Sequence, residues 1–159
     1  MNQNLDEYQK KDLQRGVDYI GVCCVFFCHD GQGNFIMHKR SDKCRDEHGR
    51  WDCGSGSMEF GESFEEGVKR EILEEYAVEP KELKLCGVRN VIREHNGQPT
   101  HWIAVVFAAL VDRDQVKIND SEKMEALDWF NTKALPNPLH SQFLTHLEFV
   151  RKEIYPQTD

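Results

Sequence analysis

The longest apolar run of the chain covers residues 17–28, VDYIGVCCVFFC, and apolar side chains there do not alternate with polar ones. A strand with that pattern is covered on both of its faces. Turn residues at 29–33, HDGQG, separate it from a second predicted strand at 34–39. The charged segment that follows, residues 40–50, predicts a loop.

Two longer strands are predicted at 82–95 and 98–111, joined by Asn96 and Gly97. An Asn-Gly pair between two strand patterns favours a tight hairpin turn. The second of these strands, THWIAVVFAALV, is apolar at odd and even positions alike, so we expect it near the centre of the sheet. A further strand is predicted at 125–130, EALDWF.

Two segments have helical rather than strand periodicity, residues 63–76 and about 139–153. Ser63 is a good N-cap for the first helix, and Glu66 completes a capping box. The second helix has apolar residues at helical spacing, namely Leu139, Phe143, Leu147 and Val150. The predicted fold is therefore α/β, of the α+β type, with a mixed sheet between helices.

The composition limits the classes of function. The 159 residues form one domain at 17–155, preceded by a polar arm or short helix at 1–16. The net charge of −8 argues against nucleic acid as a partner, and no apolar run is long enough for a membrane span. The start of the chain lacks the pattern of a signal peptide, so we expect a cytoplasmic protein. Without a C-x-x-C pair, the six cysteines are expected to be reduced thiols rather than a zinc site or disulfides.

Candidate chemistry is concentrated around the first helix, which follows a loop containing Gly54, Gly56 and Gly61. At 3.6 residues per turn, Glu71, Glu74 and Glu75 occupy one arc of that helix. Glu75 lies at the margin of the apolar stripe, where burial and like charges raise the pKa of a carboxyl group. Carboxylate oxygens suit Mg²⁺ or Mn²⁺, and a bound cation would remove both penalties. The alternative interpretation is a solvated acidic helix face.

The spacing of six residues separates these interpretations. Gly56, Glu62, Arg70, Glu71, Glu74 and Glu75 fit the pattern G-x5-E-x7-R-E-U-x-E-E-x-G-U, in which U is aliphatic. On this segment, residues 56–78, the chain resembles the Nudix hydrolase family. It departs from the pattern at Ala77, where the family has glycine. Alanine is inexpensive there if the backbone is helical and strained if φ is positive.

The resemblance implies an α/β/α sandwich that uses Mg²⁺ to hydrolyse a nucleoside diphosphate linked to another moiety. It implies that the metal is held by the Gly56 carbonyl and by Glu71, Glu74 and Glu75. Glu71 would also activate the attacking water. Arg70 would orient the glutamates through charge-assisted hydrogen bonds, with Glu62 supporting it.

Residues outside the motif have two interpretations each. Lys39 and Arg40 would neutralise phosphate oxygens, or they form a solvated strand end. Glu122 and Glu125 are alternative candidates for the base, although surface charge is the simpler role. Three aromatic residues are candidates for stacking on a nucleobase, Trp102, Trp129 and Phe60, with a core role favoured for the tryptophans.

The segment Met58–Ser63 resembles that of family members that act on nucleoside triphosphates, including modified ones, which are cleaved to the monophosphate. An ADP-ribose or nucleotide-sugar pyrophosphatase is the alternative. A non-catalytic domain that senses a nucleotide is an alternative of another class, and Ala77 is the feature that keeps it open. The expected partner is a nucleotide, with the oligomeric state open and a homodimer among the options.

Overall fold

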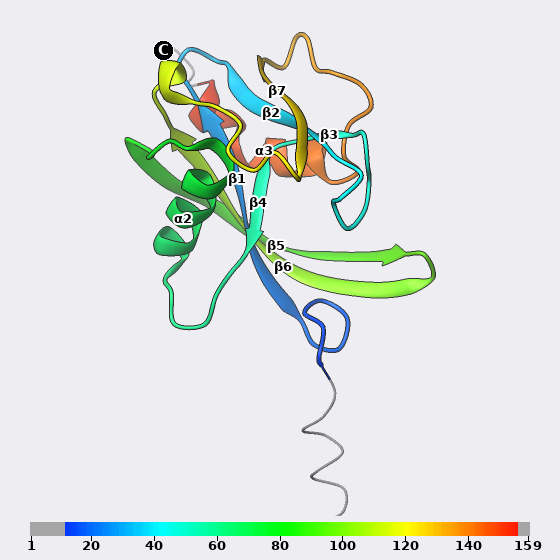
Figure 1. Cartoon of the computed structure of the whole chain (residues 1–159). Helices are drawn as coiled ribbons and strands as arrows, with labels where there is room; N and C mark the ends of the chain where they lie inside the picture. Colours follow the sequence, from blue (N-terminus) through cyan, green and yellow to red (C-terminus); the bar gives the residue numbers. More distant parts are fainter. Residues whose placement is uncertain (1–11, 156–159) are drawn as a thin grey trace, which may run out of the picture.

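One mixed sheet with a helix on each face makes up the part of the chain that the structure describes, residues 12–155 (Figure 1). The structure is a computed structural model. The strands are β1 (Gly21–His29), β2 (Phe35–Arg40), β3 (Trp51–Asp52), β4 (Gly54–Ser57), β5 (Glu82–His95), β6 (Gln98–Leu110) and β7 (Met124–Phe130). The helices are α2 (Phe64–Tyr76), the short 3-10 helix η1 (Arg113–Gln115) and α3 (Phe143–Ile154).

The main path of the sheet has the order β3-β2-β1-β6-β5, while β4 pairs with β1 and β7 pairs with β2. The pair β1 and β6 is parallel and runs in register from Gly21 opposite Trp102 to His29 opposite Leu110. The other strand pairs are antiparallel. The two most apolar strands of the sequence therefore lie side by side in the middle of the sheet, as their patterns predict.

The side chains of β1 alternate between two separate cores. Cys24, Phe26 and Cys28 belong to the cluster that α2 covers. Val25 and Phe27 belong to the cluster on the other face, which α3 covers. This alternation confirms the prediction that the strand is covered on both faces, and it confirms the predicted mixed sheet between helices.

Helix α2 begins as the sequence predicts. The Ser63 backbone N–H donates to Glu66 Oε2 at 2.7 Å, and the Glu66 N–H donates to Ser63 Oγ at 3.2 Å, so the capping box is complete. The helix ends at Ala77, which has φ 53° and ψ 32° and lies in the left-handed region. Of the two conformations considered for Ala77, the strained one is present.

The β5–β6 hairpin also follows the sequence closely. Strand β5 has the predicted bounds, and the last pair of the ladder joins His95 to Gln98. Asn96 and Gly97, the two residues of the turn, both have positive φ, 49° and 77°. Asparagine and glycine tolerate this conformation better than other residues, which explains why the pair specifies this turn.

Two parts of the sheet differ from the prediction by more than one residue. Strand β1 begins at Gly21 rather than at residue 17, because residues 16–18 form a turn that is closed by a bridge between Arg15 and Tyr19. The Gly16 N–H donates to the Tyr19 carbonyl at 2.8 Å. The expected glycine loop contains strand β4, which pairs with β1 from Ser57 opposite Cys23 to Gly54 opposite Phe26. A Cβ at Gly54 would overlap the ring of Phe26, so this pairing requires glycine.

The C-terminal helix is shorter than predicted, because α3 begins at Phe143 rather than near residue 139. Leu139 instead forms a bridge to Trp51. The Trp51 N–H donates to the Pro138 carbonyl, and the His140 N–H donates to the Trp51 carbonyl, both at 2.9 Å. The backbone groups that would start the helix are therefore used in contacts with β3. Leu139 nevertheless packs against the α3 side of the core.

All six cysteines are free, as expected, and Cys24, Cys28 and Cys53 are buried. No helix among residues 12–155 is long and apolar enough to cross a membrane. Most of the arm predicted at residues 1–16 lies outside the described residues.

Replacing Ala77 with glycine is expected to stabilise the protein. Glycine has no Cβ to strain the left-handed conformation at the end of α2, and this gain exceeds the entropy that glycine adds to the unfolded chain. We expect a gain of about 0.5–1 kcal/mol in the free energy of unfolding, or roughly 2–3 °C in Tm.

Urea unfolding of Ala77→Gly against the parent protein measures this difference. Ala77→Val is the matched comparison and should destabilise, because a β-branched residue tolerates positive φ poorly. A glycine variant less stable than the parent would contradict the interpretation of the helix end.

Candidate active site

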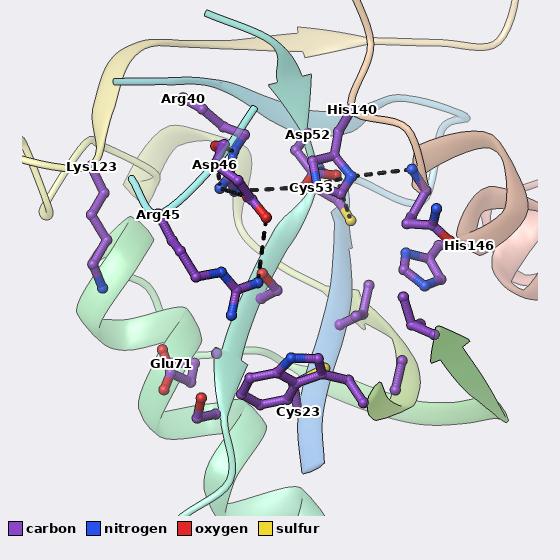
Figure 2. A pocket seen from close by; sticks show the side chains of 18 of the residues that line it. Cys23, Arg40, Arg45, Asp46, Asp52, Cys53, Glu71, Lys123, His140 and His146 are labelled. Atoms are coloured by element: carbon purple, nitrogen blue, oxygen red, sulfur yellow. Dashed lines mark hydrogen bonds and ion pairs between the residues drawn. The ribbon is translucent and has the colours of Figure 1, made fainter. Parts of the chain in front are cut away.

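A cavity of about 470 Å³ lies beside the C-terminal half of α2. Glu71 of α2 lies on one side of it, and Cys53, His140 and His146 lie on another (Figure 2). Glu74 of α2 and Gly56 of β4 also line the cavity. Its lining thus comes from α2, from the central strands, from the loop between β2 and β3 and from the segment before α3. The sequence motif accounts for only one side of this cavity.

Gly56 and Glu71 are fitted to one another. A Cβ at residue 56 would overlap the carboxylate of Glu71, so only glycine lets this carboxylate approach the backbone of β4. Glu71 is buried, with 8% of its surface exposed. Burial raises the pKa of Glu71, and the hydrogen bond from Arg70 opposes that rise. Glycine is therefore required at position 56 because a side chain there would overlap Glu71, and not because of the backbone conformation.

Arg70 joins two of the motif glutamates. Its Nη1 donates to Glu71 Oε1 at 2.7 Å. On the other side of the guanidinium, Nη2 and Nε donate to the two carboxylate oxygens of Glu62 at 2.8 and 3.1 Å. Such a two-point contact fixes the plane of the guanidinium, and through it the position of Glu71. Glu62 does not line the cavity and reaches it through Arg70.

Glu75 is the least satisfied group of the motif. It is buried, and its Oε2 has no hydrogen-bond partner among the described residues. Burial raises the pKa of Glu75 well above its ordinary value, and the charge of Glu71 raises it further. This confirms the shift expected from its place on the helix. An unpartnered buried carboxylate beside a second carboxylate fits the requirements of a hard divalent cation.

Glu74 completes the acidic face and is the accessible member of it. Its side chain is 58% exposed, and its Oε2 lies 3.5 Å from Arg70 Nη1. Glu74 lines the cavity together with Glu71, whereas Glu75 lies in the interior. The three carboxylates therefore have different environments. Glu74 is exposed to solvent, Glu71 is buried against Arg70, and Glu75 lies in the core.

The candidates outside the motif are distributed differently. Arg40 lines the cavity but donates to the Asp46 carbonyl and carboxylate at 2.9–3.1 Å. Lys39 does not line it, and its Nζ lies 3.2 Å from Glu125 at the surface. Glu122 also lies outside the cavity, with 77% of its side chain exposed.

The three aromatic candidates also have different environments. Trp102 lines the cavity, and the Arg45 guanidinium lies 5.5 Å from its ring centre. Trp129 packs against the core on the α2 side. Phe60 is fully exposed.

Sequence reasoning missed the wall of the cavity opposite the motif. Asp52 is buried there, and burial raises its pKa, while the nearby His140 and Arg40 lower it. His146 is also buried, and burial, followed by the charge of Arg89, lowers its pKa to about 4. No motif or spacing in the sequence connects these residues, because Asp52 comes from β3 and His146 from α3. Only Asp52 could have been noticed in the sequence, because it is a charged residue between the apolar residues Trp51 and Cys53.

The same wall contains a second acidic group, formed by Asp46, Glu47 and His140, whose ligand atoms lie within 4.8 Å of one another. Arg93 of β5 donates to Glu47 at 2.8 Å and to Asp46 at 3.1 Å, and His140 Nε2 lies 2.7 Å from Glu47. A guanidinium already neutralises these carboxylates and would repel a dication. This group therefore connects the β5–β6 hairpin to the loop between β2 and β3 and does not fit a metal.

The family model of the NUDIX domain matches residues 19–152. The chain belongs to the Nudix hydrolase family. The match includes every residue of the motif and both walls of the cavity. It confirms the resemblance inferred from the motif, and with it the fold class.

Relatives and solved structures agree with this assignment. The chain is 29% identical over 152 residues to 8-oxo-dGDP phosphatase NUDT18 of Mus musculus, covering 91% of this chain and 43% of the relative. It spans about two fifths of the length of the curated relatives it matches. A MutT NUDIX hydrolase from Burkholderia pseudomallei superposes with a TM-score of 0.73 at 30% identity, covering 83% of this chain and 98% of that one. The NUDIX domain of Shewanella oneidensis NrtR, solved with ADP ribose, shares the fold at 20% identity, with a TM-score of 0.68 and coverage of 98% and 100%.

The burial of Glu75 predicts how stability depends on pH in the absence of divalent cations. The pKa of Glu75 is higher in the folded protein than its ordinary value of 4.5, so the folded state binds more protons above that pH. The free energy of unfolding should therefore fall as the pH rises from about 4.5 towards the raised pKa. Glu75→Gln removes the ionisation and should flatten this decline, leaving the variant more stable at pH 8 by roughly 1 kcal/mol or more.

Urea unfolding in EDTA across this pH range measures the effect. Glu65→Gln, in the exposed first turn of the same helix and away from the cavity, is the matched control and should leave the pH profile unchanged. Addition of Mg²⁺ at pH 8 should stabilise the parent protein more than Glu75→Gln. If the free energy of unfolding of the parent and of Glu75→Gln depended on pH in the same way, the claim that ionisation of buried Glu75 destabilises the protein would be wrong.

Proposed function

We propose that this protein is a Mg²⁺-dependent pyrophosphohydrolase that cleaves the phosphoric anhydride of a nucleoside di- or triphosphate, including oxidised nucleotides, and releases the monophosphate. Mn²⁺ is expected to replace Mg²⁺. The observation that carries the proposal is the buried Glu75 carboxylate without a partner, one helical turn from Glu71, which lines the cavity. A stable protein retains such a group when a ligand compensates it or when the reaction requires it.

Glu71, Glu74, Glu75 and the Gly56 carbonyl would hold the cation. When bound, the cation lowers the pKa of water and neutralises charge on the phosphate oxygens. Glu71 is the best placed of the carboxylates to accept a proton from the attacking water, because it is the buried carboxylate that lines the cavity, and burial raises its pKa. Arg70 holds that carboxylate in position through its bond of 2.7 Å, with Glu62 on the other side of the guanidinium.

The rest of the cavity is suited to a nucleoside. Apolar side chains of Val25, Val91 and Ala104 line it, next to the ring of Trp102. Polar groups of Asp52, His140 and Gln142 also line it and offer hydrogen bonds to the edge of a base. Apolar surface against which a ring can pack, combined with polar groups that fix its orientation, is typical of pockets that orient a ligand. The cavity therefore supports a nucleotide rather than an inorganic polyphosphate as substrate.

The names of the curated relatives support an oxidised guanine nucleotide as a first candidate. Residues Met58–Ser63 support the same class, because they resemble the segment of family members that act on nucleoside triphosphates. ADP-ribose is the compound against which this candidate is best compared, since a Nudix domain of the same fold was solved with it.

A substrate panel tests the proposal. The purified protein is incubated with Mg²⁺ and 8-oxo-dGDP, the corresponding triphosphate, unmodified guanine nucleotides, ADP-ribose and a nucleotide sugar, and products are separated by chromatography. We expect monophosphate from a nucleoside di- or triphosphate and none in EDTA. Glu75→Gln should lower kcat by about 100-fold or more, since the cation loses a carboxylate ligand.

Glu65→Gln is the matched control, because Glu65 is an exposed residue in the first turn of the same helix. Its kcat should equal that of the parent. Full activity of Glu75→Gln would refute the assigned metal site. Nucleotide binding without turnover of any compound in the panel would instead support a sensing domain.

A further inference from the structure

Six cationic side chains line the cavity, and they differ in how firmly other groups hold them. The six are Arg15, Arg40, Arg45, Arg70, Arg93 and Lys123. Four of them donate hydrogen bonds of 2.7–3.1 Å to carboxylates or carbonyls: Arg15, Arg40, Arg70 and Arg93. These four groups already have partners at hydrogen-bond distance, and a ligand would have to replace those partners.

Lys123 and Arg45 are held more loosely. Lys123 Nζ lies 3.4 Å from Asp120, and its side chain is 62% exposed. Arg45 Nη2 lies 3.5 Å from Asp46, with 54% of its side chain exposed. Each of these ion pairs has a cation that is more than half exposed and lies beyond ordinary hydrogen-bond distance, so it contributes little to stability. Arg45 also lies over the Trp102 ring, at 5.5 Å from the ring centre. Among the cations that the structure describes around the cavity, these two are the most available to an anionic ligand.

The backbone places both residues next to the motif. The Ser41 N–H donates to the Lys123 carbonyl at 3.0 Å, and the Cys44 thiol donates to the same carbonyl at 3.3 Å. Asn119 in turn donates through its N–H to the Glu75 carbonyl at 3.0 Å. The loop that carries Arg45 and the loop that carries Lys123 are therefore tied to each other and to α2.

The two cations also lie at the acidic end of the cavity. Figure 2 shows Lys123 and Arg45 on the same side as Glu71, with His146 on the opposite side. Partial burial lowers the pKa of Lys123, but Asp120, Glu75 and Glu71 together raise it, which places its ammonium group in the field of the motif carboxylates. A nucleoside in the part of the cavity near His146 would direct its phosphates towards this end.

From this arrangement we infer that Lys123 and Arg45 bind the phosphate group distal to the nucleoside. The inference rests on the proposed function and narrows it to substrates that end in a free phosphate, in contrast to ADP-ribose or a nucleotide sugar, whose distal phosphate is esterified. A terminal phosphate carries more negative charge than an esterified one. Two cations therefore bind a terminal phosphate more tightly than an esterified one, and this difference in affinity selects the substrate. Lys123 is the residue next to Glu122, one of the candidates that the sequence suggested for this loop.

The test measures binding in Mg²⁺ by calorimetry, using two probes. The α,β-methylene analogue of guanosine diphosphate has a distal phosphate and resists cleavage between its phosphates, while guanosine monophosphate has no distal phosphate. Lys123→Met and Arg45→Gln should each lower the affinity for the analogue by about 10-fold, because each removes a charge-assisted contact. Each should change the affinity for the monophosphate by less than about twofold. Lys123→Arg should restore most of the affinity.

Lys43→Met is the matched control. Lys43 belongs to the same loop as Arg45, its side chain is 65% exposed, its Nζ lies 3.7 Å from Glu122, and it does not line the cavity. The variant makes the same change in net charge as Lys123→Met and should bind both probes as the parent does. Thermal unfolding of each variant checks that the fold is intact.

Equal weakening of both probes by Lys123→Met would overturn the inference, as would unchanged binding of the analogue or an equal effect of Lys43→Met. These results would leave the proposed function in place if the parent still hydrolyses a nucleotide and Glu75→Gln does not. A parent protein that binds neither probe and hydrolyses no nucleotide would overturn both proposals.

Discussion

Repulsion between the carboxylates of Glu71 and Glu75 is the interaction on which the rest of the site depends. Both groups are buried one helical turn apart on α2, where water screens their charges poorly. Arg70 compensates Glu71 through a bond of 2.7 Å, but Oε2 of Glu75 has no partner among the described residues. The protein holds this unfavourable arrangement in place through the capped start of α2 and the space that Gly56 leaves.

On the opposite wall of the cavity, an arginine neutralises two neighbouring carboxylates. Asp46 and Glu47 are paired with Arg93, which comes from β5, at 2.8–3.1 Å. Buried ion pairs of this kind contribute more to a specific arrangement than to stability, because desolvation offsets much of the attraction. One wall is thus neutralised by the protein itself, and the other is left acidic. In the proposed function, the acidic end would take the cation and the phosphates, and the other end would take the nucleoside.

Local patterns predicted the parts of the molecule that depend on neighbours in sequence. The capping box of Ser63 and Glu66, the Asn96-Gly97 turn and the apolar run of β1 each determine their own structure through hydrogen bonds, backbone conformation or burial within a short segment. The acidic face of α2 is also local, because helical geometry alone brings Glu71 and Glu75 to one side. The raised pKa of Glu75 followed from its position at the edge of the apolar stripe.

The sequence by itself therefore determined the family, the central strands, the carboxylate cluster and the class of chemistry. Only the tertiary structure decided that residues 54–57 pair as a strand, that Leu139 bridges to Trp51 instead of starting α3, and that Lys123 rather than Glu122 lines the cavity. These outcomes depend on contacts between segments far apart in the chain. Contacts between distant segments form only when the strands pair and the helices pack on the sheet, so the periodicity of a single segment does not predict them.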